Sequence, residues 1–485
     1  MTISEGGRMS ATSPTRVELN YGLEEVPRPF PKALGLGLQH VLTMFGATIL
    51  VPLILGPAME MDRVQIAILI SSVFICSGIA TFLQVTIGSR LPIIQGVSFA
   101  FLVPFFAIIA VHPGADAMRY IAGLILVGAL VEATIGFGGL FGYLRRFVTP
   151  ITIAPVIALI GLSLFAPAAQ TSALHWPLAL LMLALVFVYS LVLAPKYRFF
   201  SLFPVLLAIV TSYVVALILT GVGVFDEGSP AAVSFAGVGA ADWIRGVAIG
   251  DGGILWPWGT PLFDWTLLIG ILAAYLASMI ESFGDYHAIS RIATGGDPES
   301  KTINRGIGSE GLGCFATGLF GGFASTSYSE NIGLVGLTKV ASRYVVVLGA
   351  GALVVLGLIA KFGAVVATIP QPIVGGAYLA LFGLIAAIGL SLLRRADMDS
   401  QRNLLIVGFV LFAGFVFPSY FGSEAAADFS FFGIGWLSDI IFSIGSSGIA
   451  TAAVLGLLLD NIIPGTPEER GMVSRFEEVS TTGDV

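Results

Sequence analysis

The sequence predicts an all-α polytopic membrane protein with fourteen transmembrane segments in a 7+7 inverted repeat, and with short half-strands in segments 3 and 10. Composition gives the class: 56% of the 485 residues are hydrophobic and only 11% are charged. A soluble domain carries about 25% charged residues. The formal net charge of −7 argues against a nucleic-acid-binding protein.

Apolar stretches near 20 residues long, enough to cross a bilayer, recur along the chain. The first seven are 33–56, 64–87, 92–111, 118–141, 147–167, 174–194 and 200–223. The second seven are 264–285, 303–322, 325–341, 343–363, 368–393, 403–421 and 433–460. The long polar stretch 224–263 lies between the two sets.

The placement of basic residues supports this count. With the N-terminus inside, 19 of the 23 lysines and arginines fall in inside loops and tails, as the positive-inside rule expects. The four outside are Arg63, Arg119, Arg245 and Lys361. Seven segments in each half make the two halves enter from opposite sides, so the repeat is inverted.

The third and tenth segments are interrupted at equivalent places. Each begins with an extended stretch containing glycine or serine, Leu91 to Phe101 in one and Ser325 to Ser329 in the other, before a helical end. Broken backbone within a membrane is tolerated where it lines a cavity, so this pair of breaks predicts the substrate site. The extended pieces can pair as short strands, and two helix N-termini then face a shared midpoint.

Acidic residues within the apolar segments are candidates for substrate binding and cation coupling, because such residues are costly there. Glu281 and Asp285 are four apart and share a helix face. Asp285 lies nearer the predicted helix end, where a solvated acid is the alternative. Glu132, in the fourth segment, is either a third coupling acid or a structural one. Glu330 lies at the break of the tenth segment and can accept N–H groups of a planar heterocycle.

Other polar and aromatic residues flank the two breaks. Phe99, after Ser98, either stacks on a flat ring or packs in the core. Tyr328 and Ser329 offer backbone N–H groups beside Glu330. Asn331 either caps the short helix or orients Glu330. Gly333 permits close approach of a helix or ligand. For both residues a purely structural role is an equally open alternative.

The motif Glu330-Asn331-x-Gly333-x-x-x-x-Thr338-Lys339 resembles the signature of the nucleobase–ascorbate transporters, also called the nucleobase:cation symporter-2 family, of xanthine/uracil permease type. The resemblance covers roughly Pro31 to Asp460. It implies a core domain of segments 1–4 and 8–11, a gate domain of segments 5–7 and 12–14, substrate bound between them, and a homodimer. The expected divisions are a tail at 1–31, core 32–141, gate 142–223, extracellular loop 224–263, core 264–363, gate 364–460 and a tail at 461–485.

The resemblance also assigns roles to residues. It makes Glu281 the substrate-binding glutamate, Asp285 the acid that follows it in purine transporters, and Phe99 the stacking phenylalanine. Nucleobase carriers have Glu or Gln at the position of Glu330, whereas ascorbate carriers have proline. The Glu-Ser-x-Gly-Asp-Tyr pattern from Glu281 nevertheless resembles the vertebrate vitamin C branch.

Residues farther from the breaks are expected to support the site. In the resemblance, a Gln-His pair corresponding to Gln39 and His40 supports the acids, with a helix-packing histidine as the alternative. Thr338 is interpreted as a supporting or gating residue. Gln371-Pro372 and Gly375-Gly376 are expected to break the start of segment 12, where the role of Phe382 stays open.

The expected function is import of a nucleobase by a secondary active transporter, not an enzyme, through alternating access. No cofactor is expected; the coupling ion is H⁺, with Na⁺ as the alternative. An ascorbate or other organic-anion symporter is the alternative within the family, and a channel is the alternative outside it. The expected location is the plasma membrane, with both tails cytoplasmic. The sequence leaves open which nucleobase is carried.

Overall fold

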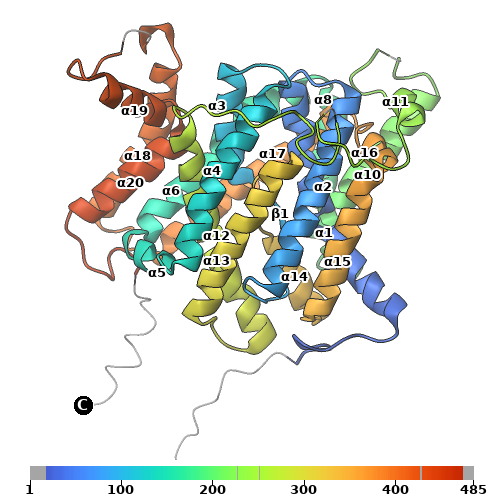
Figure 1. Ribbon diagram of the computed structural model, residues 1–485, viewed down its shortest axis with the longest axis horizontal. Coiled ribbons are helices and arrows are strands. Elements are labelled where there is room, and N and C mark those ends of the chain that lie inside the picture. The colour runs from blue at the N-terminus through green and yellow to red at the C-terminus, as the bar shows by residue number, and fades with distance from the viewer. Residues whose placement is uncertain (1–17, 227, 251, 427–428, 473–485) are drawn as a thin grey trace, which may run out of the picture.

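The structure is a bundle of helices around one two-stranded sheet (Figure 1). It is a computed structural model that describes residues 18–226, 228–250, 252–426 and 429–472. The long elements of the first half are α1 (Phe30–Ala58), α2 (Arg63–Thr86), β1 (Gln95–Val97), α3 (Leu102–Val111), α4 (Ala117–Phe137), α6 (Pro150–Ser163), α7 (Phe165–Ala173), α8 (Trp176–Phe187) and α10 (Pro204–Gly221).

The second half begins after the loop that contains the short helix α11 (Ala236–Ala240). Its elements are α12 (Leu268–Thr294), α13 (Ser300–Phe320), β2 (Ser325–Ser327), α14 (Ser329–Thr338), α15 (Arg343–Leu358), α16 (Ala360–Val366), α17 (Gln371–Leu392), α18 (Gln401–Phe421), α19 (Gly435–Gly445) and α20 (Gly448–Ile462). Short turns of helix join them: η1 (Phe99–Phe101), α5 (Phe141–Leu144), η2 (Arg145–Phe147), η3 (Val188–Leu193), α9 (Arg198–Leu202), η4 (Leu393–Arg395) and η5 (Glu424–Ala426).

The structure supports a polytopic membrane protein but not the exact number of segments. Within the described residues, 9 helices are long and apolar enough to cross a membrane, or up to 10 if α15 and α16, bent by 84°, form one span. Phe99–Val111 and Gly448–Ile462 are shorter apolar helices. The predicted tenth segment is divided between the strand β2 and the 10-residue helix α14. The fourteen-segment count therefore stays a prediction.

The helices pack in two groups. α1, α2, α4, α13 and α15 contact one another, and α6, α7, α8, α17, α18 and α20 contact one another. The ends of the groups are far apart, with α15 and α16 on one side of the bundle and α18 to α20 on the other (Figure 1). Within the first group α4 and α13 nearly touch: a Cβ at Gly136 would lie 2.1 Å from the nitrogen of Gly308. Small residues permit such contact between membrane helices.

The predicted half-strands are present. β1 and β2 pair antiparallel, with Gln95 opposite Ser327 and Val97 opposite Ser325. Two further backbone bonds extend the ladder, from Tyr328 to the carbonyl of Ile94 and from Ser98 to that of Ala324, both at 3.0 Å. The pairing satisfies backbone groups that water cannot reach at this depth. It also brings the two breaks in the chain side by side.

Two sequence expectations about helix bounds were wrong. α12 continues to Thr294, so Asp285 lies within the helix rather than near its end. α17 starts at Gln371 with Pro372 in its first turn, where proline needs no hydrogen-bond partner, and it runs unbroken through Gly375 and Gly376. These glycines are packing contacts: a Cβ on Gly376 would lie 2.2 Å from the carbonyl oxygen of Ala179.

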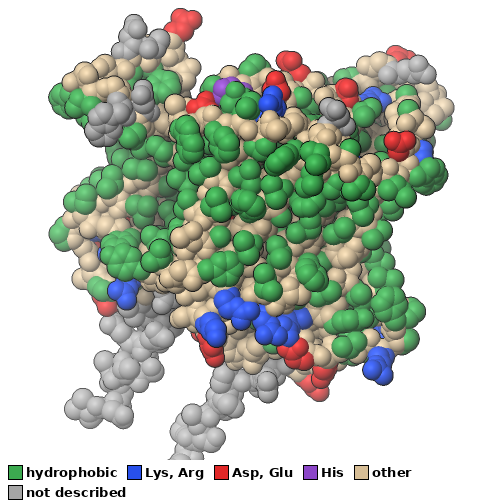
Figure 2. All heavy atoms as spheres, viewed as in Figure 1, with side chains coloured by type: hydrophobic (Ala, Val, Ile, Leu, Met, Phe, Trp, Pro, Cys, Tyr) green, Lys and Arg blue, Asp and Glu red, His purple; other side chains and the backbone are tan. Residues whose placement is uncertain are grey.

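The surface is consistent with a lipid-facing protein. Figure 2 shows hydrophobic side chains covering the middle of the face, with lysines and arginines gathered mainly along its lower edge. The described part of the chain begins near this edge (Figure 1). The loop between α10 and α12 is anchored by Arg245, whose guanidinium donates to Ser72 Oγ at 2.8 Å. Burial lowers the pKa of Arg245 to about 10, which leaves it charged at neutral pH.

Candidate functional site

A central cavity of about 980 Å³ lies where the two broken segments meet the second helix group. One side is polar and comes from β1, η1, α12, β2 and α14. The other side is aliphatic and comes from α6 and α17. The polar side includes Phe99, Glu281, Asp285, Ser327, Tyr328, Ser329 and Glu330; the aliphatic side includes Ile153, Ile157, Leu381, Leu384 and Ile385.

The local chain path explains why polar groups converge here. After β1, Ser98 accepts a hydrogen bond from the nitrogen of Ala100 and so starts the turn η1. After β2, Tyr328 is the N-cap of α14, and Glu330 lies in its first turn. The free N–H groups of a helix start carry partial positive charge. A carboxylate is favourable there, and a ligand oxygen would be too.

Three carboxyl groups converge on the cavity. Glu281 and Asp285 lie one turn apart on α12, and Glu330 comes from α14. Glu281 and Glu330 are exposed to the cavity, whereas Asp285 is buried at its edge. Asp285 accepts hydrogen bonds from Ser327 Oγ at 2.8 Å and Ser329 Oγ at 2.7 Å. Like charges that share one cavity repel, and a proton or a bound hydrogen-bond donor reduces this repulsion.

A fourth acid, Glu310 of α13, was missed in the sequence. It lies behind the cavity, 1% exposed, and accepts hydrogen bonds from Ser278 at 2.9 Å, Tyr286 at 3.0 Å and Ser282. The signal was present, because Glu310 is an acid within the apolar stretch 303–322. Glu132 was singled out because an acidic residue within an apolar segment is costly, and the same reason applies to Glu310.

The structure places His40 and Asn331 behind the cavity rather than in its lining. The side-chain amide of Asn331 donates to the carbonyl oxygen of His40 at 3.0 Å and lies 3.2 Å from His40 Nδ1. This contact attaches α14 to α1. Gln39, half-buried on α1, has its carbonyl bonded by Thr43 at 2.9 Å and also lies outside the lining.

The remaining predicted residues have local roles in the described structure. Ser98 is buried as a cap. The Tyr328 ring covers Gly96, and its hydroxyl donates to the carbonyl of Val97 at 3.0 Å. Thr338 donates to the carbonyl of Leu334 at the far end of α14. Around Gly333 no described heavy atom lies within 4 Å of a Cβ position, so no helix approaches it there.

An aromatic contact joins the two sides of the cavity. Phe99 is partly exposed and meets Phe382 of α17 edge to face, with ring centroids 6.2 Å apart. Phe382 is buried and stacks on Tyr378 at 4.8 Å. Phe382 therefore packs against the Phe99 ring, and Phe99 itself lines the cavity.

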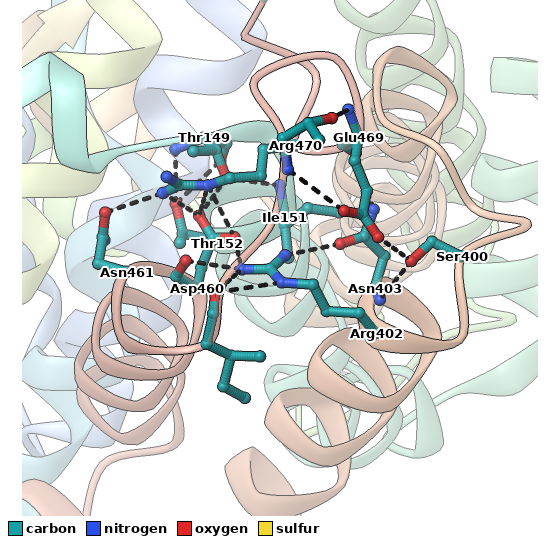
Figure 3. A network of polar contacts seen from close by, with 12 residues as sticks. Thr149, Ile151, Thr152, Ser400, Arg402, Asn403, Asp460, Asn461, Glu469 and Arg470 are labelled. Carbon is teal, nitrogen blue, oxygen red and sulfur yellow. Dashed lines mark hydrogen bonds and ion pairs between the residues drawn. The ribbon is translucent and has the colours of Figure 1, made fainter.

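The far end of the cavity is basic and adjoins the polar network in Figure 3. Its lining includes Arg146, His287, Arg291, Arg395 and Met472. Beside it the buried carboxylate of Asp460 accepts hydrogen bonds from Thr149 at 2.8 Å, Arg402 at 3.0 Å and Arg470 at 2.8 Å. The network ties α18, α20 and the chain after α20 to the start of α6 (Figure 3).

Comparisons with known proteins agree with this architecture. A sequence model of the permease family matches residues 31–422. Solute carrier family 23 member 2 of Mus musculus is 37% identical over 504 residues, which is 95% of this chain and 76% of that protein. Nucleobase-ascorbate transporter 2 of Arabidopsis thaliana is 33% identical over 94% of this chain and 90% of its own length.

Two solved structures share the fold at low sequence identity. The transmembrane domain of a cyanobacterium bicarbonate transporter, BicA, aligns with a TM-score of 0.57 at 15% identity, over 88% of this chain and 100% of that one. The murine anion transporter Slc26a9 in its inward-facing state aligns with a TM-score of 0.62 at 10% identity, over 91% and 69%. At such identity the likeness concerns the fold alone.

Proposed function

Because the chain belongs to the permease family that includes the nucleobase–ascorbate transporters, and is therefore a membrane transporter and not an enzyme, we propose that it imports a nucleobase together with a proton. The observation that carries the proposal is the placement of Glu281 and Glu330, both exposed to one cavity at the break of the tenth segment. Two acceptor groups suit a ligand that presents several N–H donors on a rigid edge.

Ascorbate is the second candidate substrate, because the relatives from Arabidopsis thaliana are named after both nucleobases and ascorbate. Ascorbate is an anion at neutral pH. In the cavity, the negative charge of ascorbate would lie beside the carboxyl groups of Glu281, Asp285 and Glu330. These like charges would repel unless cations enter together with ascorbate. A neutral base with N–H donors meets no such repulsion, so the polar side of the cavity favours the nucleobase.

In the proposed mechanism the first helix group, together with α12, α14 and the paired strands, is the core domain, and the second helix group is the gate domain. The base lies between them, held by Glu281 and Glu330 and covered by the Phe99 ring. A proton on Asp285 or Glu281 removes a charge that would otherwise oppose movement through the membrane. Alternating access is then rocking of one helix group against the other. With the basic edge inside, the basic end of the cavity faces the cytoplasm.

The test is uptake by the purified protein in proteoliposomes, with labelled xanthine and competing urate, uracil and ascorbate. The panel is run at two pH values, each with and without Na⁺. The expected result is saturable uptake driven by an inward proton gradient, with bases competing and ascorbate not competing. Ascorbate outcompeting every base would overturn the substrate assignment, and non-saturable flux without counterflow would indicate a channel.

A further inference from the structure

A second pair of acids lies inside the first helix group, outside the cavity lining. Glu132 of α4 and Glu310 of α13 are each 1% exposed. The two helices that carry them are in close backbone contact, since a Cβ at Gly311 would lie 2.4 Å from the nitrogen of Ala133. Two buried carboxyl groups on helices packed this closely repel each other when both are ionised. The proposed transport step uses neither of them.

The two acids differ in their hydrogen bonds. Glu310 accepts three, from Ser278, Ser282 and Tyr286. Neither oxygen of Glu132 has a hydrogen-bond partner among the described residues, although both are buried. Hydroxyl donors stabilise an ionised carboxylate, whereas a buried carboxylate without donors is strongly disfavoured. The pair is therefore most stable with one proton, on Glu132, and one negative charge, on Glu310.

The neighbours of Glu132 do not provide a compensating positive charge. Four titratable groups interact electrostatically with Glu132. They are Glu310 and Cys314 of α13 and Tyr275 and Tyr286 of α12. The third helix packed on α4, α3, contains no titratable residue. These groups are all neutral or anionic. Within the described structure, the charge of Glu132 is thus removed by protonation and not by an ion pair.

A chain of hydroxyl groups connects this pair to the cavity. Ser282 Oγ contacts Glu310 and lies 2.8 Å from Ser327 Oγ. Ser327 in turn donates to Asp285 at 2.8 Å. Each hydroxyl can pass its own proton to the next group while it receives one from the group before, so a proton that leaves Asp285 appears on the ionised carboxylate of Glu310, and each serine ends with one proton as it began.

We propose that Glu132 and Glu310 form a second proton-binding site of the core, which exchanges a proton with Asp285 through Ser327 and Ser282. The site lets the protein take up a proton behind the substrate, so that Asp285 can change its charge while the cavity is occupied. This inference rests on the proposed proton-coupled transport, but the existence of the bound proton can be tested without substrate.

The first test is infrared spectroscopy of the purified protein at neutral pH, which detects the carbonyl stretch of protonated carboxyl groups. Glu132→Gln keeps the shape of the side chain and removes the acid. We expect a protonated-carboxyl band in the wild type that loses one component in Glu132→Gln. The matched control is Glu24→Gln, because Glu24 is exposed and ion-paired with Arg343, so the band should not change. An unchanged band in Glu132→Gln overturns the proposal.

The second test measures transport in Glu310→Gln, which removes the acid at the end of the hydroxyl chain. This variant should lose accumulation driven by a pH gradient while it keeps counterflow exchange of the base, because exchange needs no net proton movement. Gradient-driven accumulation equal to that of the wild type overturns the proposal. If the wild type itself fails to transport a base, the proposed function fails, while the infrared result still decides whether the proton is there. For the infrared test, Glu132→Leu, which also removes the buried polar group, provides a second variant if Glu132→Gln impairs folding.

Discussion

Ser327 Oγ donates a hydrogen bond of 2.8 Å to Asp285, and so links the half-strand β2 directly to the helix α12. The two residues are far apart in the sequence, and they meet because β2, which pairs with β1, packs against α12. Ser329, from the start of α14, donates to the other oxygen of the same carboxyl group at 2.7 Å. A movement of the broken segment therefore changes the hydrogen bonds, and with them the proton affinity, of Asp285.

Replacing Asp285 with Asn should separate coupling from binding. The amide keeps the size of the side chain but cannot gain or lose a proton, so accumulation driven by a pH gradient should fall more than counterflow exchange. The measurement is the ratio of the two rates in proteoliposomes. If both Asp285→Asn and Glu281→Gln accumulate base as the wild type does, neither acid couples transport to protons.

Replacing Glu330 should reveal the substrate class. Glu330→Ala leaves donors of the base unpaired in the site, at a cost of about 1–3 kcal/mol. This corresponds to a loss of affinity of roughly one to two decades, at about 1.4 kcal/mol per decade. Glu330→Gln keeps one acceptor and adds a donor, so it should change the preference among bases.

The readout for Glu330 is competition by xanthine, urate, uracil and ascorbate in the wild type and both variants. Membrane abundance of each variant is the control, because the exposed position of Glu330 in the cavity predicts a local effect. Equal base uptake by the wild type and Glu330→Ala would remove Glu330 from the binding site.

Cysteine labelling should test the predicted orientation in the membrane. Val247, in the long loop after α10, is 88% exposed, and Arg395 lies at the basic end of the cavity. Val247→Cys should react with an impermeant maleimide added outside intact cells, and Arg395→Cys only after permeabilisation. The native Cys76 and Cys314 are buried and serve as the unlabelled background. The opposite labelling pattern would invert the topology.

Replacing Asp460 with Ala should destabilise the second helix group. Asp460 is fully buried and paired with two largely buried arginines, Arg402 and Arg470 (Figure 3). Removing one partner of a buried pair costs about 3–5 kcal/mol. Asp297→Ala is the matched control, because the Arg291–Asp297 pair is exposed and such pairs contribute about 0–1 kcal/mol. Melting of the purified variants should show a clear decrease in Tm for Asp460→Ala alone.

Much of the site could be predicted from the sequence because its signals are local. The breaks at Gln95–Val97 and Ser325–Ser327 are visible as small and polar residues between apolar stretches, and the structure pairs them as strands. The expected breaks at Gly375 and Gly376 were wrong, because glycine also serves close helix packing, and only the neighbouring helix decides which role applies. The end of α12 was missed because polar residues after Asp285 continue the helix.

The sequence by itself determined that the chain is a membrane transporter of one family, with acids at Glu281, Asp285 and Glu330, since composition and motif spacing depend only on residues near one another in the chain. Only the tertiary structure decided which hydrogen-bond donors surround each buried acid, and therefore which acid can remain ionised. Glu132 and Glu310 look alike as single acids in apolar stretches. One meets no hydrogen-bond donor among the described residues and the other meets three hydroxyl groups from α12, because the donors of a buried acid come from neighbouring helices and not from its own.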